Sequence, residues 1–194
     1  MDLDYSNQDL DILPEIDGNP KYFTCSLNYL RYLPDSIGNF TNLLILECTC
    51  NELEYLPDSI GKLSNLEYLA CSFNYIKRLP DSICNLTKLR ILYCNNNELE
   101  YLPNLDLLHT LYCHDNNLIE INGFADCEIL ECSNNRLKSI PRVQDNCIVY
   151  LDGNESTLII PFGVQYPDFY SVYDRYIKII RAIITIQRKF RINF

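Results

Sequence analysis

The stretch Leu-Glu-Tyr-Leu-Ala-Cys-Ser-Phe-Asn-Tyr-Ile-Lys-Arg-Leu-Pro at residues 66–80 recurs in related form along most of this chain. The shared template is L-x-x-L-x-C-x-x-N-x-L-x-x-L-P, and its asparagine recurs 23 residues apart three times and then 19 residues apart three times. A fixed period in this range is typical of solenoids, in which each repeat buries its apolar side only against its neighbours. The repeated asparagines are Asn28, Asn51, Asn74, Asn97, Asn116, Asn135 and Asn154.

One rung of the template has a direct physical interpretation. Leu69 and Cys71 lie two residues apart, so they point to the same side of a short strand. Asn74 follows where the chain leaves the strand, and its amide can satisfy backbone groups in the turn and in the neighbouring rung. Ile76 and Leu79 are expected to point inward from the next segment. Stacked rungs would then bury one continuous core and pair their strands in a parallel sheet.

The template resembles the leucine-rich-repeat family, and Leu-Pro-Asp-Ser-Ile-Gly-Asn at residues 33–39 is similar to its cytoplasmic, plant-type branch. The resemblance covers residues 3–155. It implies an α/β solenoid of horseshoe shape, with a parallel sheet on the concave face, a mostly irregular convex side and a protein partner on the concave face. The cysteine-rich rungs and the sequence Ile-Gln-Arg-Lys-Phe-Arg at residues 186–191 also resemble repeat proteins of giant DNA viruses.

We expect the chain to have two parts. Residues 1–156 form the repeat array, with about seven rungs and an N-terminal cap in which Gln8 takes the asparagine position. Residues 157–194 form a C-terminal capping segment and a basic amphipathic helix. Little helix is expected before residue 168, although Asp35, Asp58 and Asp81 are placed to cap single helical turns. Strands are expected at residues 22–26, 45–49, 68–72, 91–95, 110–114, 129–133 and 148–151.

Composition narrows the classes of function. The chain has 194 residues, 47% of them apolar, which suits one continuous core. Its net charge of −10 disfavours nucleic acid as the main partner. Residues 1–4 are acidic and precede no apolar run, and no stretch of 18 apolar residues exists, so we expect neither a signal peptide nor a transmembrane segment. A cytoplasmic location follows, in the host cytoplasm if the protein is viral.

Six of the ten cysteines occupy the same inward strand position, which predicts a ladder of buried thiols about 4.8 Å apart. A metal strip or a chain of disulfides is the alternative. Equivalent positions on parallel strands point the same way, however, and no His or acid joins them at ligand spacing. We therefore expect reduced thiols, no metal and no cofactor, with Cys50 and Cys147 the more exposed of the other four. The ladder contains Cys25, Cys48, Cys71, Cys94, Cys113 and Cys132.

The outward strand positions form the candidate binding surface. Exposed aromatic and aliphatic side chains on one rigid sheet suit partner binding, although Tyr and Ile also simply favour strands. Tyr93 and Tyr112 are the expected anchors, with an acidic rim at Glu47 and Glu131. The candidate partner-binding residues are Tyr22, Tyr68, Phe73, Tyr93, Tyr112, Glu47, Glu131 and Tyr150.

Catalysis has little support in the sequence. His114 and the neighbouring Cys113 are expected to point to opposite sides of the sheet, so they form no nucleophile–base pair. The chain has no glycine-rich phosphate loop and no metal-binding motif. We therefore expect a protein that is not an enzyme.

The C-terminal segment has a different chemistry. Residues 169–194 carry six basic residues against one acid, so this segment has a charge of +5 and the rest of the chain −15. Two adjacent apolar stripes at helical spacing predict an amphipathic helix. Ile186, Gln187 and Arg191 resemble the first half of an IQ motif, which binds calmodulin-like proteins, although Ile192 replaces the usual glycine.

Several roles remain open for this helix. It could seal the last rung, bind a partner, lie on an acidic membrane surface, or dock on its own acidic array. The sequence therefore predicts a non-enzymatic interaction module that binds a protein on its concave face. The alternatives are an adaptor whose C-terminal helix makes the main contact, and a self-associating structural protein.

Overall fold

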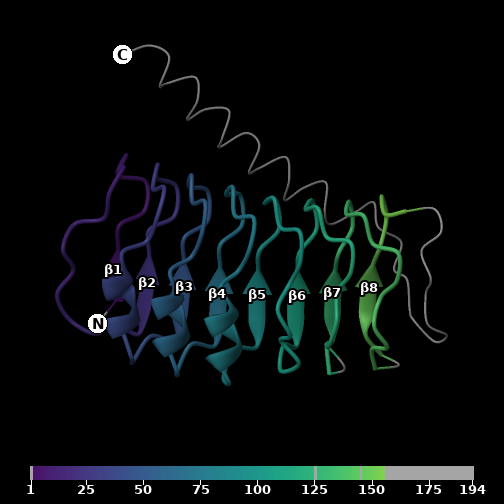
Figure 1. Ribbon diagram of the computed structural model, residues 1–194. Helices are drawn as coiled ribbons and strands as arrows, with labels where there is room; N and C mark the ends of the chain where they lie inside the picture. The colour runs from purple at the N-terminus through teal and green to yellow at the C-terminus, as the bar shows by residue number, and fades with distance from the viewer. Residues whose placement is uncertain (1, 125, 145, 156–194) are drawn as a thin grey trace, which may run out of the picture.

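A computed structural model describes residues 2–124, 126–144 and 146–155. Its strands form one open parallel sheet in which each strand pairs with the next one in sequence, as expected of a leucine-rich-repeat solenoid (Figure 1). The N-terminal segment contributes a full strand to this sheet, and the predicted helix within residues 157–194 lies outside the described residues. The strands are β1 (Asp2–Asp4), β2 (Tyr22–Thr24), β3 (Ile45–Glu47), β4 (Tyr68–Ala70), β5 (Ile91–Tyr93), β6 (Thr110–Tyr112), β7 (Ile129–Glu131) and β8 (Ile148–Tyr150).

The sheet keeps one register from rung to rung. Leu46 pairs with Leu69, and Leu69 pairs with Leu92. All three are fully buried, so the middle residue of each of these strands points into the core. The strands are shorter than the sequence predicted. The backbone N–H group of the ladder cysteine still donates a hydrogen bond to the next rung. For example, the Cys48 N–H donates to the Ala70 carbonyl at 2.8 Å. Two residues later Cys50 adopts a left-handed conformation with φ 57°, which turns the chain out of the strand.

The repeated asparagines hold neighbouring rungs together. The Asn74 side-chain amide donates to the carbonyls of Cys71 at 3.0 Å and Ser72 at 3.2 Å in its own rung. It also donates to the Cys48 carbonyl of the preceding rung at 3.1 Å, and its Oδ1 accepts the Leu53 N–H at 2.9 Å. The same contacts recur at Asn51, Asn97, Asn116 and Asn135, so we call this set the asparagine ladder.

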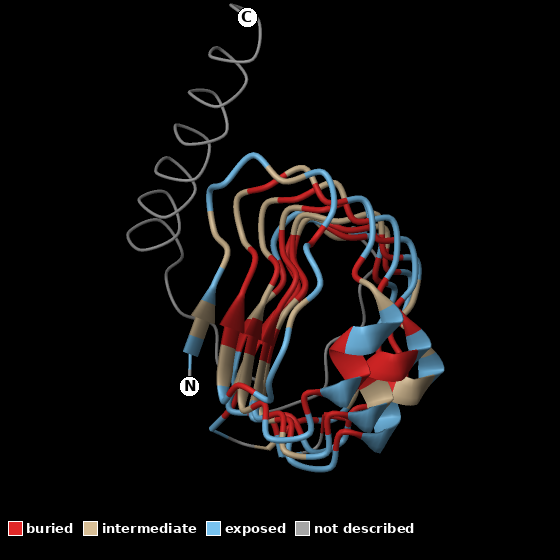
Figure 2. Cartoon of the chain, turned by 90° about the vertical axis from the view of Figure 1, so that its left-hand side faces the viewer, coloured by how far each residue is buried: buried red, intermediate tan, exposed pale blue. Residues whose placement is uncertain are grey.

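Short 3₁₀ helices cover the side of the solenoid opposite to the sheet, but only in the first rungs (Figure 2). They are η1 (Asp35–Asn39), η2 (Asp58–Lys62) and η3 (Asp81–Asn85), stacked in that order. The prediction that the aspartates cap these turns was wrong. A proline takes the capping position before each turn, no side chain makes a capping hydrogen bond, and the aspartate is already the first helical residue.

Glycines allow the helical turns to stack closely. A Cβ atom built on Gly61 would lie 2.5 Å from the Ser82 carbonyl oxygen of the next turn, and Gly38 meets Ser59 in the same way. In η3 this position is occupied by Cys84. In the described residues no helical turn follows η3, because the next rungs are four residues shorter. The Cys84 side chain therefore meets no helical turn of the next rung, and its thiol donates to the Asn104 carbonyl at 3.3 Å.

The cysteine ladder is confirmed. All six ladder cysteines are fully buried, and none of the ten cysteines forms a disulfide. Burial raises the pKa of Cys25 and Cys71 to about 12, so these thiols stay protonated at neutral pH. The expectation for Cys147 was wrong, because it fills an inward position directly before β8 and is fully buried. Cys84 is exposed instead, at the end of the helical layer.

Removing one asparagine of the ladder should destabilise the folded array. Asn74→Ala leaves the buried Leu53 N–H group without its acceptor and removes one of two donors from each of the Cys48, Cys71 and Ser72 carbonyls. We expect the free energy of unfolding to fall by about 2 kcal/mol or more, measured by chemical denaturation. The exposed Asn42 is the control, and Asn42→Ala should cost less than about 0.5 kcal/mol. Equal losses in the two variants would contradict the role of the ladder.

Thiol labelling of the native protein should follow exposure. A maleimide reagent with peptide mapping should modify Cys84 first and Cys50 second, and should reach the six ladder thiols only after unfolding. Rapid modification of a ladder thiol, or stoichiometric zinc in the purified protein, would overturn this description of the core.

Gly61 and Cys84 occupy equivalent positions in η2 and η3, so a substitution at one serves as the control for the other. Gly61→Ala forces a methyl group against Ser82, so we expect a loss of about 1–3 kcal/mol in the free energy of unfolding. Cys84→Ala, at the equivalent place in the last helical turn, should change it by less than about 0.5 kcal/mol. Unfolding of both variants at the same denaturant concentration would contradict close stacking of the helical turns at Gly61.

Candidate functional site

The first and third residues of each strand form the sheet face, which points away from the core. Of the predicted partner-binding residues, seven lie on this face. Phe73 follows β4 instead, half-exposed and in a left-handed conformation with φ 56°. The face residues are Tyr22 and Tyr68 at first positions, and Glu47, Tyr93, Tyr112, Glu131 and Tyr150 at third positions.

An aromatic row crosses the middle of the sheet face. The rings of Tyr93 and Tyr112 stack with centroids 4.7 Å apart and an interplanar angle of 12°. Tyr68 lies against Tyr93 at 5.5 Å, and His114 meets the edge of Tyr112 at 6.4 Å. The sheet register places Tyr93 directly opposite Tyr112, so the stack follows from the regular repeat. We call Tyr68, Tyr93 and Tyr112 the tyrosine row.

The two predicted rim acids differ in environment. Glu47 is half-buried, and its Oε2 accepts a hydrogen bond from the Tyr22 hydroxyl at 2.7 Å. Burial, reinforced by this carboxylate, raises the pKa of Tyr22 to about 12. Glu131 was expected at an exposed rim, but it is only 1% exposed. Its Oε1 accepts the Ser133 N–H at 3.0 Å, and burial raises the pKa of its carboxyl group.

A polar cluster that the sequence did not predict surrounds the end of the tyrosine row. His114 Nδ1 lies 2.8 Å from Asp115 Oδ2, and Asp115 Oδ1 accepts a hydrogen bond from the Asn134 amide at 3.0 Å. His114 was expected to point out into solvent, yet it is only 2% exposed. Burial keeps the pKa of the adjacent Cys113 thiol high, so this cysteine is not an activated nucleophile. Only the unusual run of polar residues after β6 could have indicated this cluster.

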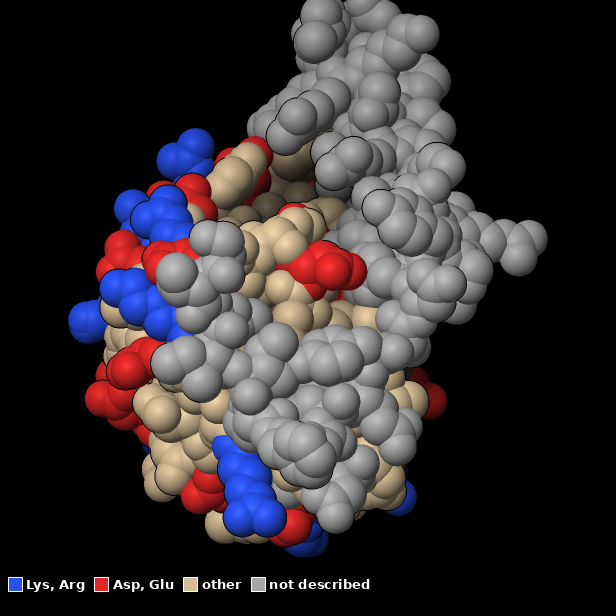
Figure 3. Space-filling model, turned by 90° about the vertical axis from the view of Figure 1, so that its right-hand side faces the viewer, with Lys and Arg blue, Asp and Glu red and all other residues tan. Residues whose placement is uncertain are grey.

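The sheet face is acidic and lacks cations. The strands carry Asp2, Asp4, Glu47 and Glu131, and none of them carries a Lys or Arg. Figure 3, seen from the β8 end, shows Lys and Arg side chains interspersed with Asp and Glu on the side of the molecule away from the sheet. The described cations are Lys21, Arg31, Lys62, Lys77, Arg78, Lys88, Arg90, Arg136, Lys138 and Arg142.

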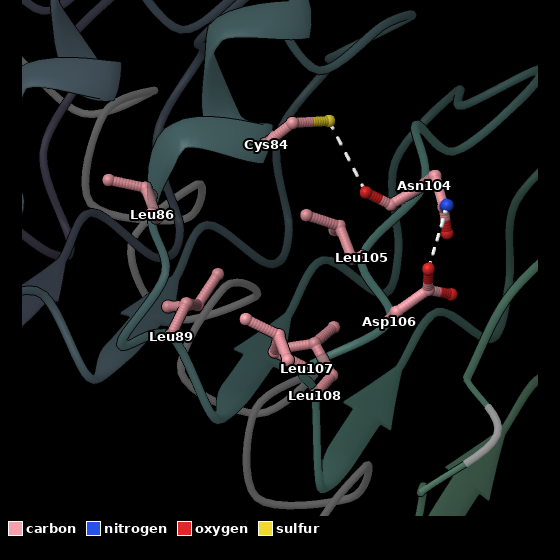
Figure 4. A pocket seen from close by; sticks show the side chains of 8 residues that line it. All are labelled: Cys84, Leu86, Leu89, Asn104, Leu105, Asp106, Leu107 and Leu108. Atoms are coloured by element: carbon pink, nitrogen blue, oxygen red, sulfur yellow. Dashed lines mark hydrogen bonds between the residues drawn. The ribbon is translucent and has the colours of Figure 1, made fainter.

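A cavity on the convex side is a weaker candidate. It lies beside η3, has a volume of about 180 Å³ and is lined mainly by leucines (Figure 4). The Cys84 thiol donates to the Asn104 carbonyl at 3.3 Å, and the Asn104 side chain bonds to Asp106 at 2.9 Å. Small-molecule pockets usually enclose about 300–1,000 Å³. The cavity lies where the helical layer ends, so we interpret it as a packing gap left by the shorter rungs.

None of the helical turns in the described part of the chain has the length and hydrophobicity that a bilayer-spanning helix requires. No curated protein matches the sequence significantly.

Several solved structures share the fold. A leucine-rich-repeat protein of Leptospira interrogans is 27% identical, with a TM-score of 0.64 over 76% of this chain and 42% of that one. The leucine-rich effector protein YopM of Yersinia pestis is 24% identical, with a TM-score of 0.66 over 83% of this chain and 52% of that one. The plant peptide hormone receptor RGFR1, solved in complex with RGF2, is 22% identical, with a TM-score of 0.61 over 75% and 28%. This chain thus matches between 28% and 52% of their lengths.

The leucine-rich-repeat region family matches residues 21–127, which is more than half of the chain. That match covers β2 to β6 and the three helical turns, and thus the whole tyrosine row. The periodic sequence, the parallel sheet and the solved relatives all agree with it. The chain belongs to the leucine-rich-repeat family.

Proposed function

We propose that this protein is a non-enzymatic interaction module that binds a partner protein on its sheet face. The tyrosine row is the observation that carries this proposal. Its three rings lie in contact on strands whose register is fixed by the core, so little conformational freedom remains to be lost on binding. Tyrosine combines large contact area with a hydroxyl group, and it is enriched among the residues that dominate binding energies.

The relatives and the charge pattern support the same class of function. The plant receptor RGFR1 was solved in complex with RGF2, a peptide hormone interaction on the same fold. An acidic sheet face disfavours nucleic acid, whose phosphates would be repelled. Ten free thiols favour a reducing compartment such as the cytoplasm.

The second candidate function is that of an adaptor in which residues 169–194 make the main contact with a partner. The charge of +5 on this segment, with its IQ-like residues Ile186, Gln187 and Arg191, favours a calmodulin-like protein or an acidic membrane surface. Removing the basic residues would abolish that contact and leave the sheet face unchanged.

Affinity purification from the native host, followed by binding measurements with the purified partner, tests the sheet face. We expect the double variant Tyr93→Ala/Tyr112→Ala to weaken binding by at least about 2 kcal/mol, roughly 30-fold. Thermal unfolding of the free variant would confirm that the array remains folded.

The control is Tyr32→Ala/Tyr55→Ala, which removes two tyrosines that are 41% and 53% exposed and lie beyond the strands. This variant should bind the partner normally. If it loses more affinity than the sheet-face variant does, the binding surface lies on the edge of the array.

A further inference from the structure

We infer that Cys127 and Cys147 form an oxidation site, at which a peroxide converts two contacting thiols into a disulfide between the rungs of β7 and β8. The six ladder cysteines are buried to the same extent, but their thiols are arranged differently. The oxidation site lies on the core side of the sheet, so its test needs no partner protein and is independent of the proposed sheet-face function.

Both cysteines lie in the turn that leads into a strand, in two successive rungs. The Cys127 N–H donates to the Phe124 carbonyl at 3.0 Å. The Cys147 N–H makes the same bond, also at 3.0 Å, to the carbonyl of Gln144, three residues earlier. Glu128 separates Cys127 from β7, whereas Cys147 directly precedes β8. The two cysteines are therefore offset by one residue relative to the strand register.

This offset distinguishes the pair from the cysteine ladder. With strands about 4.8 Å apart and a rise of about 3.3 Å per residue, an offset of one residue puts the two Cα atoms about 6 Å apart. Disulfides most often join Cα atoms at about this distance. Ladder cysteines take equivalent positions on parallel strands, so their side chains point the same way and not at each other. The offset pair is thus the one suited to a disulfide.

The two thiols are already in contact in the reduced protein. The Cys127 and Cys147 side chains are hydrogen-bonded to each other. Cys127 Sγ also lies 3.0 Å from the Ile129 carbonyl oxygen. Cys147 Sγ lies 3.8 Å from the carbonyl oxygen of Ile148, the residue that pairs with Ile129 across the sheet. Both sulfur atoms therefore lie at the same level of adjacent rungs.

This contact makes the two thiols chemically unequal. The hydrogen bond from Cys127 lowers the pKa of the Cys147 thiol from its ordinary value, while the same contact, together with burial, raises the pKa of Cys127. Peroxides react with thiolates and not with thiols. Cys147 is therefore the nucleophile and Cys127 the resolving cysteine. A ladder thiol such as Cys71 has a pKa raised to about 12 by burial, so it stays protonated.

The reaction consumes one peroxide molecule. The Cys147 thiolate attacks a peroxide oxygen, the O–O bond breaks, and the departing hydroxide becomes water with the proton that Cys147 has lost. The Cys127 sulfur then attacks the Cys147 sulfenic acid, so that the S–S bond forms, the S–O bond breaks, and a second water leaves with the Cys127 proton. Reducing thiols such as glutathione reverse the link, as expected of a redox-sensing disulfide in a reducing compartment.

Treatment of the native full chain with hydrogen peroxide tests the site. The remaining thiols are alkylated in denaturant, and peptides are mapped by mass spectrometry. Trypsin cleaves at Arg136 and Arg142, so Cys127 and Cys147 fall in different peptides that stay joined until reduction. We expect this link to form at least tenfold faster than oxidation of any ladder thiol. Because the ladder thiols are also 0% exposed, they control for access of the oxidant.

Two results of this mapping would overturn the inference. One is a chain in which Cys127 and Cys147 stay reduced under conditions that oxidise the ladder thiols. The other is a link from Cys147 to Cys132, which would show that the ladder supplies the resolving thiol.

The variant Cys127→Ser separates the two chemical roles, because it keeps a hydroxyl donor but cannot form the disulfide. We expect Cys147 to gain oxygen in this variant, as sulfenic and then sulfinic acid, detected by mass. Cys94→Ser places the same group in the ladder and should leave the Cys127–Cys147 link unchanged. Thermal unfolding checks that both variants remain folded. An unoxidised Cys147 in folded Cys127→Ser would contradict its role as nucleophile, and the mapping of the unsubstituted chain decides the case if either variant unfolds.

Discussion

The structure depends on one recurring contact, in which each asparagine amide satisfies backbone groups of two successive rungs at once. A strand of three residues provides few hydrogen bonds, and the chain must turn out of the sheet immediately after it. At Asn74, three carbonyls and one N–H group in and between rungs are satisfied by one side chain. Without this side chain the buried Leu53 N–H group would lack an acceptor, which costs about 1–3 kcal/mol, and each of the three carbonyls would lose one of its two donors. The core, the register and the sheet face all follow from this repeated turn.

The structural roles of residues that recur at a strict spacing could be predicted from the sequence alone. The positions of Leu69, Cys71 and Asn74 specified the strand direction, the core side and the turn, because period-two alternation and side-chain hydrogen bonding are local properties. The outward placement of Tyr93 and Tyr112 followed from the same alternation. The stacking of their rings depends on the register between β5 and β6, which pairs Tyr93 with Tyr112.

Other features depend on contacts that the template does not encode. Cys147 lies off the cysteine ladder and was expected to be exposed, but packing directly before β8 buries it. Glu131 occupies an outward position but is only 1% exposed, and burial is a property of the assembled structure. The proline before each helical turn already fixes an extended conformation, so Asp35 and its equivalents start the turn and do not cap it. The buried pairing of His114 with Asp115 likewise required three-dimensional placement.

Hydroxyl-radical footprinting with the purified partner tests most directly whether a partner binds the acidic sheet face with its central tyrosine row. Side-chain oxidation of individual tyrosines, measured by mass spectrometry, reports which surface becomes covered. If the partner binds the sheet face, Tyr93 and Tyr112 become protected on binding, while Tyr32 and Tyr55 remain as reactive as in the free protein. Protection of Tyr32 and Tyr55 with no change at Tyr93 and Tyr112 would contradict it.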